Sequence, residues 1–139
     1  MIHVLIPITI GGLIYVCFRS KTLRFFDWID KVGFSAVVNE IRSIAYPYKE
    51  VLPSWVVNSL PDGLWVYSFS AILFFAYKKY FIQNKILLML PFILILIMEV
   101  LQLLDVISGT FDIMDLVISL IMNLLLIAIL KLKYNEKSN

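Results

Sequence analysis

Long runs without a charged residue constrain this chain more than any other feature. Residues 1–18, 86–98 and 116–130 contain no Lys, Arg, Asp or Glu. Apolar residues make up 61% of the chain and charged residues 16%, against about 45–50% and about 25% in a soluble domain. These runs exclude a soluble globular domain, a disordered chain and a disulfide-rich module. They predict an integral membrane protein that forms one domain over residues 1–139.

Four apolar stretches have the length of membrane-spanning helices. A span needs about 20 mostly apolar residues, within a range of about 17–25. The predicted spans are residues 2–18, 60–77, 86–104 and 111–130. The first has neither a basic start nor a cleavage site, so we expect it to be retained rather than removed as a signal peptide. The predicted fold is therefore an all-α, integral membrane four-helix bundle.

The segment between the first two spans, residues 19–59, has a different pattern. Charges recur throughout it, so no charge-free stretch in this segment is long enough to cross a membrane. Two short amphipathic helices fit, at about residues 20–31 and 35–45, broken by Gly33 and ended by Pro47. Aromatic side chains beside basic ones are typical of the headgroup level. We predict interfacial helices here.

The basic residues predict an orientation. Four spans place both termini on one side of the membrane. Six basic residues follow the first span in the long segment 19–59, and six lie in the short loop 78–85 and the C-terminal tail. Because Lys and Arg count most in short segments beside a span, the loop and tail are expected in the cytoplasm, with both termini.

The same topology gathers polar residues at one membrane surface. The second span begins, the third ends and the fourth begins on the same side. Glu99 and Gln102 share one helix face, as do Asp112 and Asp115, because each pair is three residues apart. The turn at 108–110 folds these two faces together. The candidate ligand-binding residues are Glu99, Gln102, Asp112, Asp115 and Asp62.

Each acid also has a structural interpretation. Asp112 fits an N-cap and Asp115 a first-turn acid that favours the helix dipole. Asp105 fits a loop or cap residue, and Asp62 fits turn chemistry. A charged group inside a span costs about 2.5–3.5 kcal/mol and usually marks function, which favours Glu99 as a functional residue. Its alternative is a protonated side chain bonded to Gln102 or Asn123.

The spacing of these residues resembles a known family. Glu99-Val-Leu-Gln102, followed by Gly109-Thr-Phe-Asp112-Ile-Met-Asp115, is similar to the acid-x-x-Gln, glycine turn and Asp-x-x-Asp of VanZ-like proteins. The resemblance covers roughly residues 60–125. It implies a small multi-pass protein of the bacterial cell envelope, placed in the inner (plasma) membrane.

Two functions follow as hypotheses. The first is binding of a lipid-linked glycan or lipid headgroup at the acidic surface, with a divalent cation such as Mg²⁺ or Ca²⁺ held by Glu99, Asp112 and Asp115. The second is a non-catalytic assembly subunit with a membrane-protein partner. An ion pathway is disfavoured, because Ser119 and Asn123 are nearly the only polar residues deeper in the fourth span. The small, scattered net charge of +2 excludes nucleic acid as a partner, and no motif names a catalytic residue or reaction.

Overall fold

The structure, a computed structural model, describes residues 1–78 and 85–135. Within these residues it is all-helical, with no strand. The elements in chain order are α1 (Ile2–Phe18), α2 (Arg24–Val32), α3 (Ser35–Ala45), η1 (Tyr46–Glu50), α4 (Ser54–Asn58), α5 (Leu60–Ala76), η2 (Lys85–Met89), α7 (Leu90–Leu103) and α8 (Ile113–Asn135).

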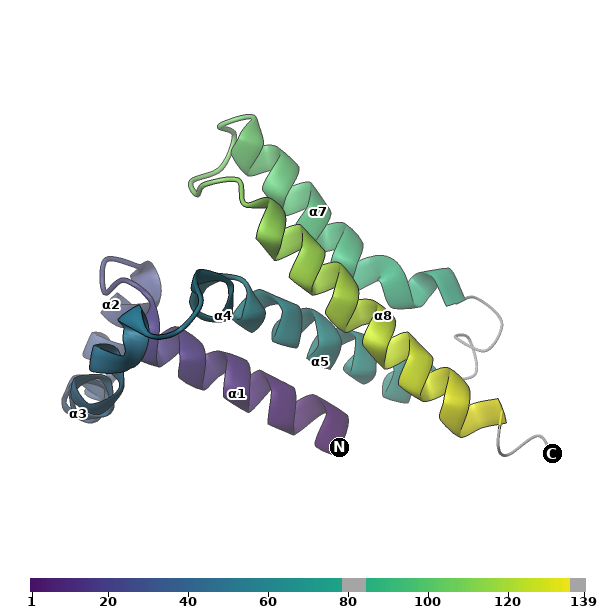
Figure 1. The fold of residues 1–139 in the computed structure, drawn as a ribbon, viewed down its shortest axis with the longest axis horizontal. Helices are drawn as coiled ribbons and strands as arrows, with labels where there is room; N and C mark the ends of the chain where they lie inside the picture. The colour runs from purple at the N-terminus through teal and green to yellow at the C-terminus, as the bar shows by residue number, and fades with distance from the viewer. Residues whose placement is uncertain (79–84, 136–139) are drawn as a thin grey trace.

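Helix α5 lies at the centre, with α1 on one side and α8 on the other (Figure 1). Glycines allow both close approaches. A Cβ on Gly11 of α1 would lie 3.0 Å from the Trp65 ring nitrogen of α5, and one on Gly63 of α5 would lie 2.7 Å from Ile118 of α8. Small residues let membrane helices pack backbone to backbone. A Cβ on the neighbouring Gly12 would meet nothing within 4 Å, so of these two glycines only Gly11 is needed for the close approach.

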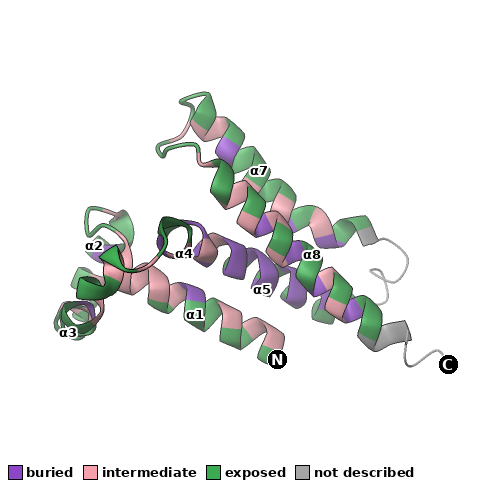
Figure 2. Ribbon diagram, viewed as in Figure 1, coloured by how far each residue is buried: buried purple, intermediate pink, exposed green. Residues whose placement is uncertain are grey.

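The apolar core is formed mainly by α5 and α8. Ala71 of α5 and Leu126 of α8 are fully buried, and η2 contributes Leu88 to the same core. Figure 2 shows that buried residues concentrate along α5, while α1, α7 and α8 keep exposed outer faces. The remaining buried members of this core are Tyr67, Phe74 and Leu130.

A polar contact inside the bundle follows from a proline. In a 3-10 turn the carbonyl of Leu88 would accept the N–H of residue 91. Pro91 has no N–H, so this hydrogen bond cannot form. The buried Asn123 side chain of α8 supplies the missing donor, with its Nδ2 2.9 Å from the Leu88 oxygen and 2.7 Å from the Ser70 hydroxyl. This contact joins α5, η2 and α8 well inside the apolar region.

Helix α7 is arranged with its charge inside and its apolar side chains outside. Its buried residues are Pro91 and Glu99. The apolar side chains that it exposes are Leu90, Ile93, Leu94, Leu96, Ile97, Met98, Val100 and Leu103. A soluble protein has the opposite pattern, because carboxylates are almost never buried unless they are paired.

Among the residues that the structure describes, two helical stretches are long and apolar enough to cross a membrane, Ile86–Leu103 and Ile113–Leu132. Only 17% and 22% of these windows are buried, whereas the core helix of a soluble protein is mostly buried. Helices α1 and α5 are also apolar but shorter, at 17 residues each.

The observed helices follow the predicted spans with local differences. A helix over residues 2–18 is confirmed, and the helix predicted over 60–77 ends one residue early. The third predicted span begins as the 3-10 turn η2, because Pro91 delays the α-helix. The fourth begins two residues late and runs on to Asn135. The basic loop 78–85 lies largely outside the described residues.

The segment after α1 folds as the predicted pair of short helices plus one more. Helix α3 matches the one expected at 35–45, whereas α2 begins at Arg24 rather than near residue 20. Gly33, with φ of 83°, ends α2 as predicted, since glycine adopts this left-handed conformation without strain. The additional helix, α4, lies between Pro53 and Pro61.

Candidate functional site

The ends of four helices meet at one end of the bundle, where α1 and α7 end and α5 and α8 begin. Arg19, just after α1, lies 3.4 Å from Asp62 in the first turn of α5. Glu99 of α7 is hydrogen-bonded to the residue before α8. Asp62 interacts electrostatically with both Glu99 and Asp115. We call the set Arg19, Ser59, Asp62, Glu99, Asp112 and Asp115 the acidic mouth.

Glu99 is buried and points across the α7–α8 turn. Its side chain is 5% exposed, and Oε2 accepts the backbone N–H of Asp112 at 2.8 Å. The first amides of a helix have no partner inside the helix, so a carboxylate there is favoured by hydrogen bonding and by the helix dipole. Within the described residues this bond replaces the one expected to Gln102 or Asn123.

Asp112 is the N-cap of α8. Its Oδ1 accepts the backbone N–H of Met114 at 2.8 Å, and its carbonyl accepts that of Asp115 at 3.1 Å. The capping interpretation of Asp112 is therefore observed. Because its carboxylate is already hydrogen-bonded to the Met114 amide, Asp112 is a weaker candidate than Asp115 for contacting a ligand.

Arg19 places a positive charge in the acidic mouth that the sequence interpretation missed. Its guanidinium pairs with Asp62, donates to the Asn58 carbonyl at 2.8 Å and lies 5.7 Å from the Tyr15 ring centre. The interpretation had counted Arg19 among the charges of the interfacial segment. The end of the first predicted span lies on the same side as the start of the second, so the topology already places Arg19 near Asp62.

Asp115 and its neighbours leave buried polar atoms unsatisfied. Asp115 Oδ1, Ser59 Oγ and Arg19 Nε are all buried, and none of the three has a well-aligned hydrogen-bond partner among the described residues. They belong to one place, because Asp115 interacts with both the Ser59 hydroxyl and the Arg19 charge. An unsatisfied buried polar group costs about 1–3 kcal/mol, so these atoms favour a polar occupant, although the Ser59 hydroxyl lies close enough to Asp115 to satisfy it in part.

Gln102 and Asp105 lie apart from this site. The Gln102 side chain packs on Gly109, where an added Cβ would lie 2.7 Å from the Gln102 amide. No hydrogen bond joins Gln102 to the acids among the described residues. Asp105 is exposed in the left-handed conformation (φ 54°), just beyond α7. The N–H groups of Asp105 and Val106 bond back to Gln102 and Leu101, which terminates the helix.

The acids are not arranged as a metal centre. In the part of the chain that the structure describes, no three His, Cys, Asp or Glu side chains lie close enough together to hold one metal ion. Glu99 and Asp112, two of the three acids considered for a divalent cation, are engaged with backbone amides. Arg19 supplies the positive charge beside the acids.

Comparisons of the chain with protein-family models, with curated proteins and with solved structures found no match.

Proposed function

We propose that this chain is a small four-span membrane protein of the cell envelope that binds a hydroxyl-bearing headgroup at its acidic mouth. The membrane location is supported by α7, which buries Glu99 and exposes its apolar side chains. Helices α1 and α5 serve as the two further spans, since 17 residues reach the lower limit for crossing. The charge distribution supports cytoplasmic termini, and the VanZ-like spacing supports a bacterial inner membrane.

The unsatisfied atoms at Ser59, Asp115 and Arg19 carry the proposal of a ligand. Arg19 Nε is a donor, Asp115 Oδ1 is an acceptor and the Ser59 hydroxyl can be either. A ligand hydroxyl both donates and accepts, so one hydroxyl could satisfy Asp115 and Arg19 together. A bare cation would satisfy the acceptor and oppose Arg19. The chemistry therefore favours a sugar or polyol headgroup, as on a lipid-linked glycan.

The test is binding of a defined glycolipid to the purified protein. Diglucosyl-diacylglycerol is titrated into detergent-solubilised protein, and diacylglycerol without the sugar is the reference. We expect saturable binding of the glycolipid and its weakening by about tenfold or more, or ~1.4 kcal/mol, in Asp115→Asn and Ser59→Ala. Asp105→Asn is the matched control, because it removes an exposed carboxylate outside the acidic mouth.

The alternative function, a subunit of a larger membrane assembly, is tested with the same purified protein. It predicts that the sugar adds nothing to binding and that the protein copurifies with one membrane protein at fixed stoichiometry. The exposed apolar side of α7 would then be covered by that protein rather than by lipid. Equal binding of the glycolipid and of diacylglycerol would overturn the proposed headgroup site.

A further inference from the structure

A second polar site, which shares no residue with the acidic mouth, lies between the end of α1 and helix α3. It is a pocket of about 340 Å³ lined by Lys21, Asn39, Arg42, Ser43 and Tyr46. Every polar group in this lining is a potential hydrogen-bond donor, and two are cations. No acidic side chain lines it. We call this set the basic pocket.

Arg42 is the unusual member of the basic pocket. Its side chain is 7% exposed, although arginine is almost never buried unless it is paired. Its Nη1 donates to the Val16 carbonyl at 2.5 Å, and its guanidinium lies 5.1 Å and 5.6 Å from the ring centres of Phe26 and Tyr46. These contacts position the group without neutralising its charge.

Neither cation of the basic pocket has an acidic partner in the part of the chain that the structure describes. Among the described residues the one ion pair is Arg19 with Asp62, which belongs to the acidic mouth. Lys21 donates to the neutral Asn39 side chain. Burial of an unpaired charge is costly, so this arrangement favours an anion. The guanidinium fork matches the geometry of phosphate oxygens, and a lysine ammonium adds a second charge.

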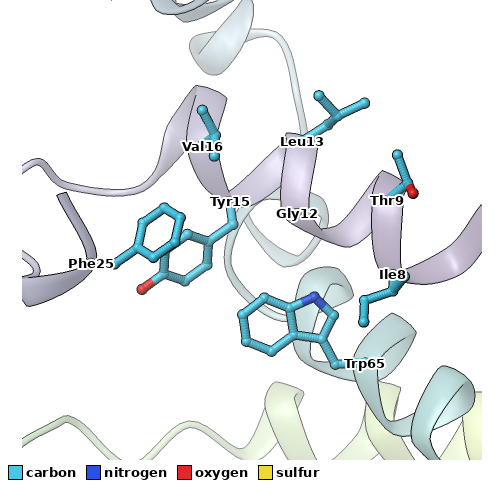
Figure 3. A pocket seen from close by; sticks show the side chains of 8 residues that line it. All are labelled: Ile8, Thr9, Gly12, Leu13, Tyr15, Val16, Phe25 and Trp65. Atoms are coloured by element: carbon cyan, nitrogen blue, oxygen red, sulfur yellow. The ribbon is translucent and has the colours of Figure 1, made fainter. Parts of the chain in front are cut away.

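An apolar groove beside the basic pocket indicates that the anion is the headgroup of a lipid. The groove has a volume of about 540 Å³ and lies along α1, with Trp65 of α5 and Phe25 of α2 at its sides (Figure 3). It is open at Gly12, where a Cβ would meet nothing within 4 Å. Val16 connects the two sites, because it lines the groove and its carbonyl accepts a hydrogen bond from Arg42 of the basic pocket. Tyr15 and Trp65 stack along the groove at 5.7 Å.

We propose that the basic pocket binds the phosphate of an anionic phospholipid, with one acyl chain in the groove beside α1. The charge of the pocket selects the phosphate, and the apolar groove commits the ligand to a lipid rather than to free phosphate. Basic clusters at the membrane surface attract anionic lipids in this way. The site uses none of the side chains of the acidic mouth.

The test uses fluorescence of Trp65, which lines the groove. With Trp28→Phe and Trp55→Phe, Trp65 is the single tryptophan of the chain. The detergent-solubilised protein is titrated with phosphatidylglycerol brominated on its acyl chains, because bromine quenches a tryptophan that it contacts. We expect saturable quenching at concentrations at least fivefold lower than with brominated phosphatidylcholine.

Variants of the basic pocket separate this site from general detergent partitioning. Lys21→Gln and Arg42→Gln are expected to weaken phosphatidylglycerol binding at least fivefold, whereas Lys31→Gln, an exposed residue outside the pocket, leaves it unchanged. Because Arg42 is buried, Lys21→Gln and Asn39→Asp keep the test valid if Arg42→Gln fails to fold. Equal quenching by both lipids, or equal loss in Lys31→Gln, would overturn the proposal. Displacement of the lipid by inorganic phosphate at equal concentration would overturn the lipid assignment.

Phosphatidylglycerol also carries headgroup hydroxyls, so the variants decide which site binds it. Binding that is lost in Lys21→Gln and kept in Asp115→Asn assigns the lipid to the basic pocket, and the glycolipid test then stands or fails independently.

Discussion

The Glu99 carboxylate accepts the backbone N–H of Asp112 at 2.8 Å, across the turn that joins α7 to α8. The bond ties the end of one apolar helix to the start of the next. It also places the Glu99 charge within electrostatic reach of Asp112 and Asp115. Glu99 thus has a structural contact and a place in the acidic mouth at the same time.

Substitution of Glu99 separates these two contributions. Glu99→Gln keeps an oxygen that can accept the Asp112 amide and removes the charge, so the unfolding free energy should stay close to that of the wild type. Glu99→Leu removes the acceptor and should cost about 1–3 kcal/mol. Reversible unfolding in mixed micelles measures both. Equal destabilisation by the two substitutions would contradict the role of the Glu99–Asp112 bond.

The cap of α8 gives a second prediction. Asp112→Asn should change the unfolding free energy little, because asparagine caps a helix about as well as aspartate. Asp112→Ala should destabilise the protein by about 0.5–2 kcal/mol, because the Met114 amide loses its acceptor. The same unfolding assay reads both variants. If alanine is tolerated as well as asparagine, the carboxylate of Asp112 is not serving as a cap.

The contact at Asn123 gives a third prediction. Asn123→Ala removes donors to the Leu88 carbonyl and the Ser70 hydroxyl, both inside the bundle. Hydrogen bonds between membrane helices contribute about 0.6–2 kcal/mol. A loss of that size, measured as unfolding free energy, is expected for Asn123→Ala. Asn58→Ala, on an exposed side chain, is the control and should have no effect.

The topology can be measured by cysteine labelling from each side of the membrane. In a Cys17→Ser background, Glu40→Cys and Ser108→Cys should react with a membrane-impermeant maleimide from one side, and Ile2→Cys from the other. All three positions are exposed in the structure. Reaction of positions 40 and 108 from opposite sides would exclude four spans with an interfacial segment after the first.

Much of the fold could be predicted because long apolar stretches without a charge favour helices of matching length. The helices at Ile2–Phe18 and Leu60–Ala76 follow the predicted ranges closely. The start of α7 does not, because apolar length says nothing of the hydrogen bonds that Pro91 removes. The extent of α8 also differs, since the helix continues past the apolar run into basic residues that a helix tolerates equally well.

The site was less predictable than the fold. Topology alone places Asp62, Glu99 and Asp115 at one end of the bundle. It does not show which acid is satisfied by its own backbone, as Asp112 is, because capping depends on side-chain direction. The spacing predicts Gln102 beside Glu99. In the structure the Gln102 side chain packs on the turn instead, because Gly109 has no side chain to exclude it. Ser59 had no signal in the sequence, since its significance lies in its complete burial beside Asp115.

Photo-crosslinking of a glycolipid is the most direct test of the proposed headgroup site. A diacylglycerol that carries a diazirine on its sugar is irradiated with the protein in lipid nanodiscs, and the modified peptides are identified by mass spectrometry. Crosslinks are predicted on the segments around Ser59 and Asp115, with loss of both in Asp115→Asn and retention in Asp105→Asn. Crosslinks confined to the exposed apolar side of α7, unchanged in Asp115→Asn, would contradict a headgroup site at the acidic mouth.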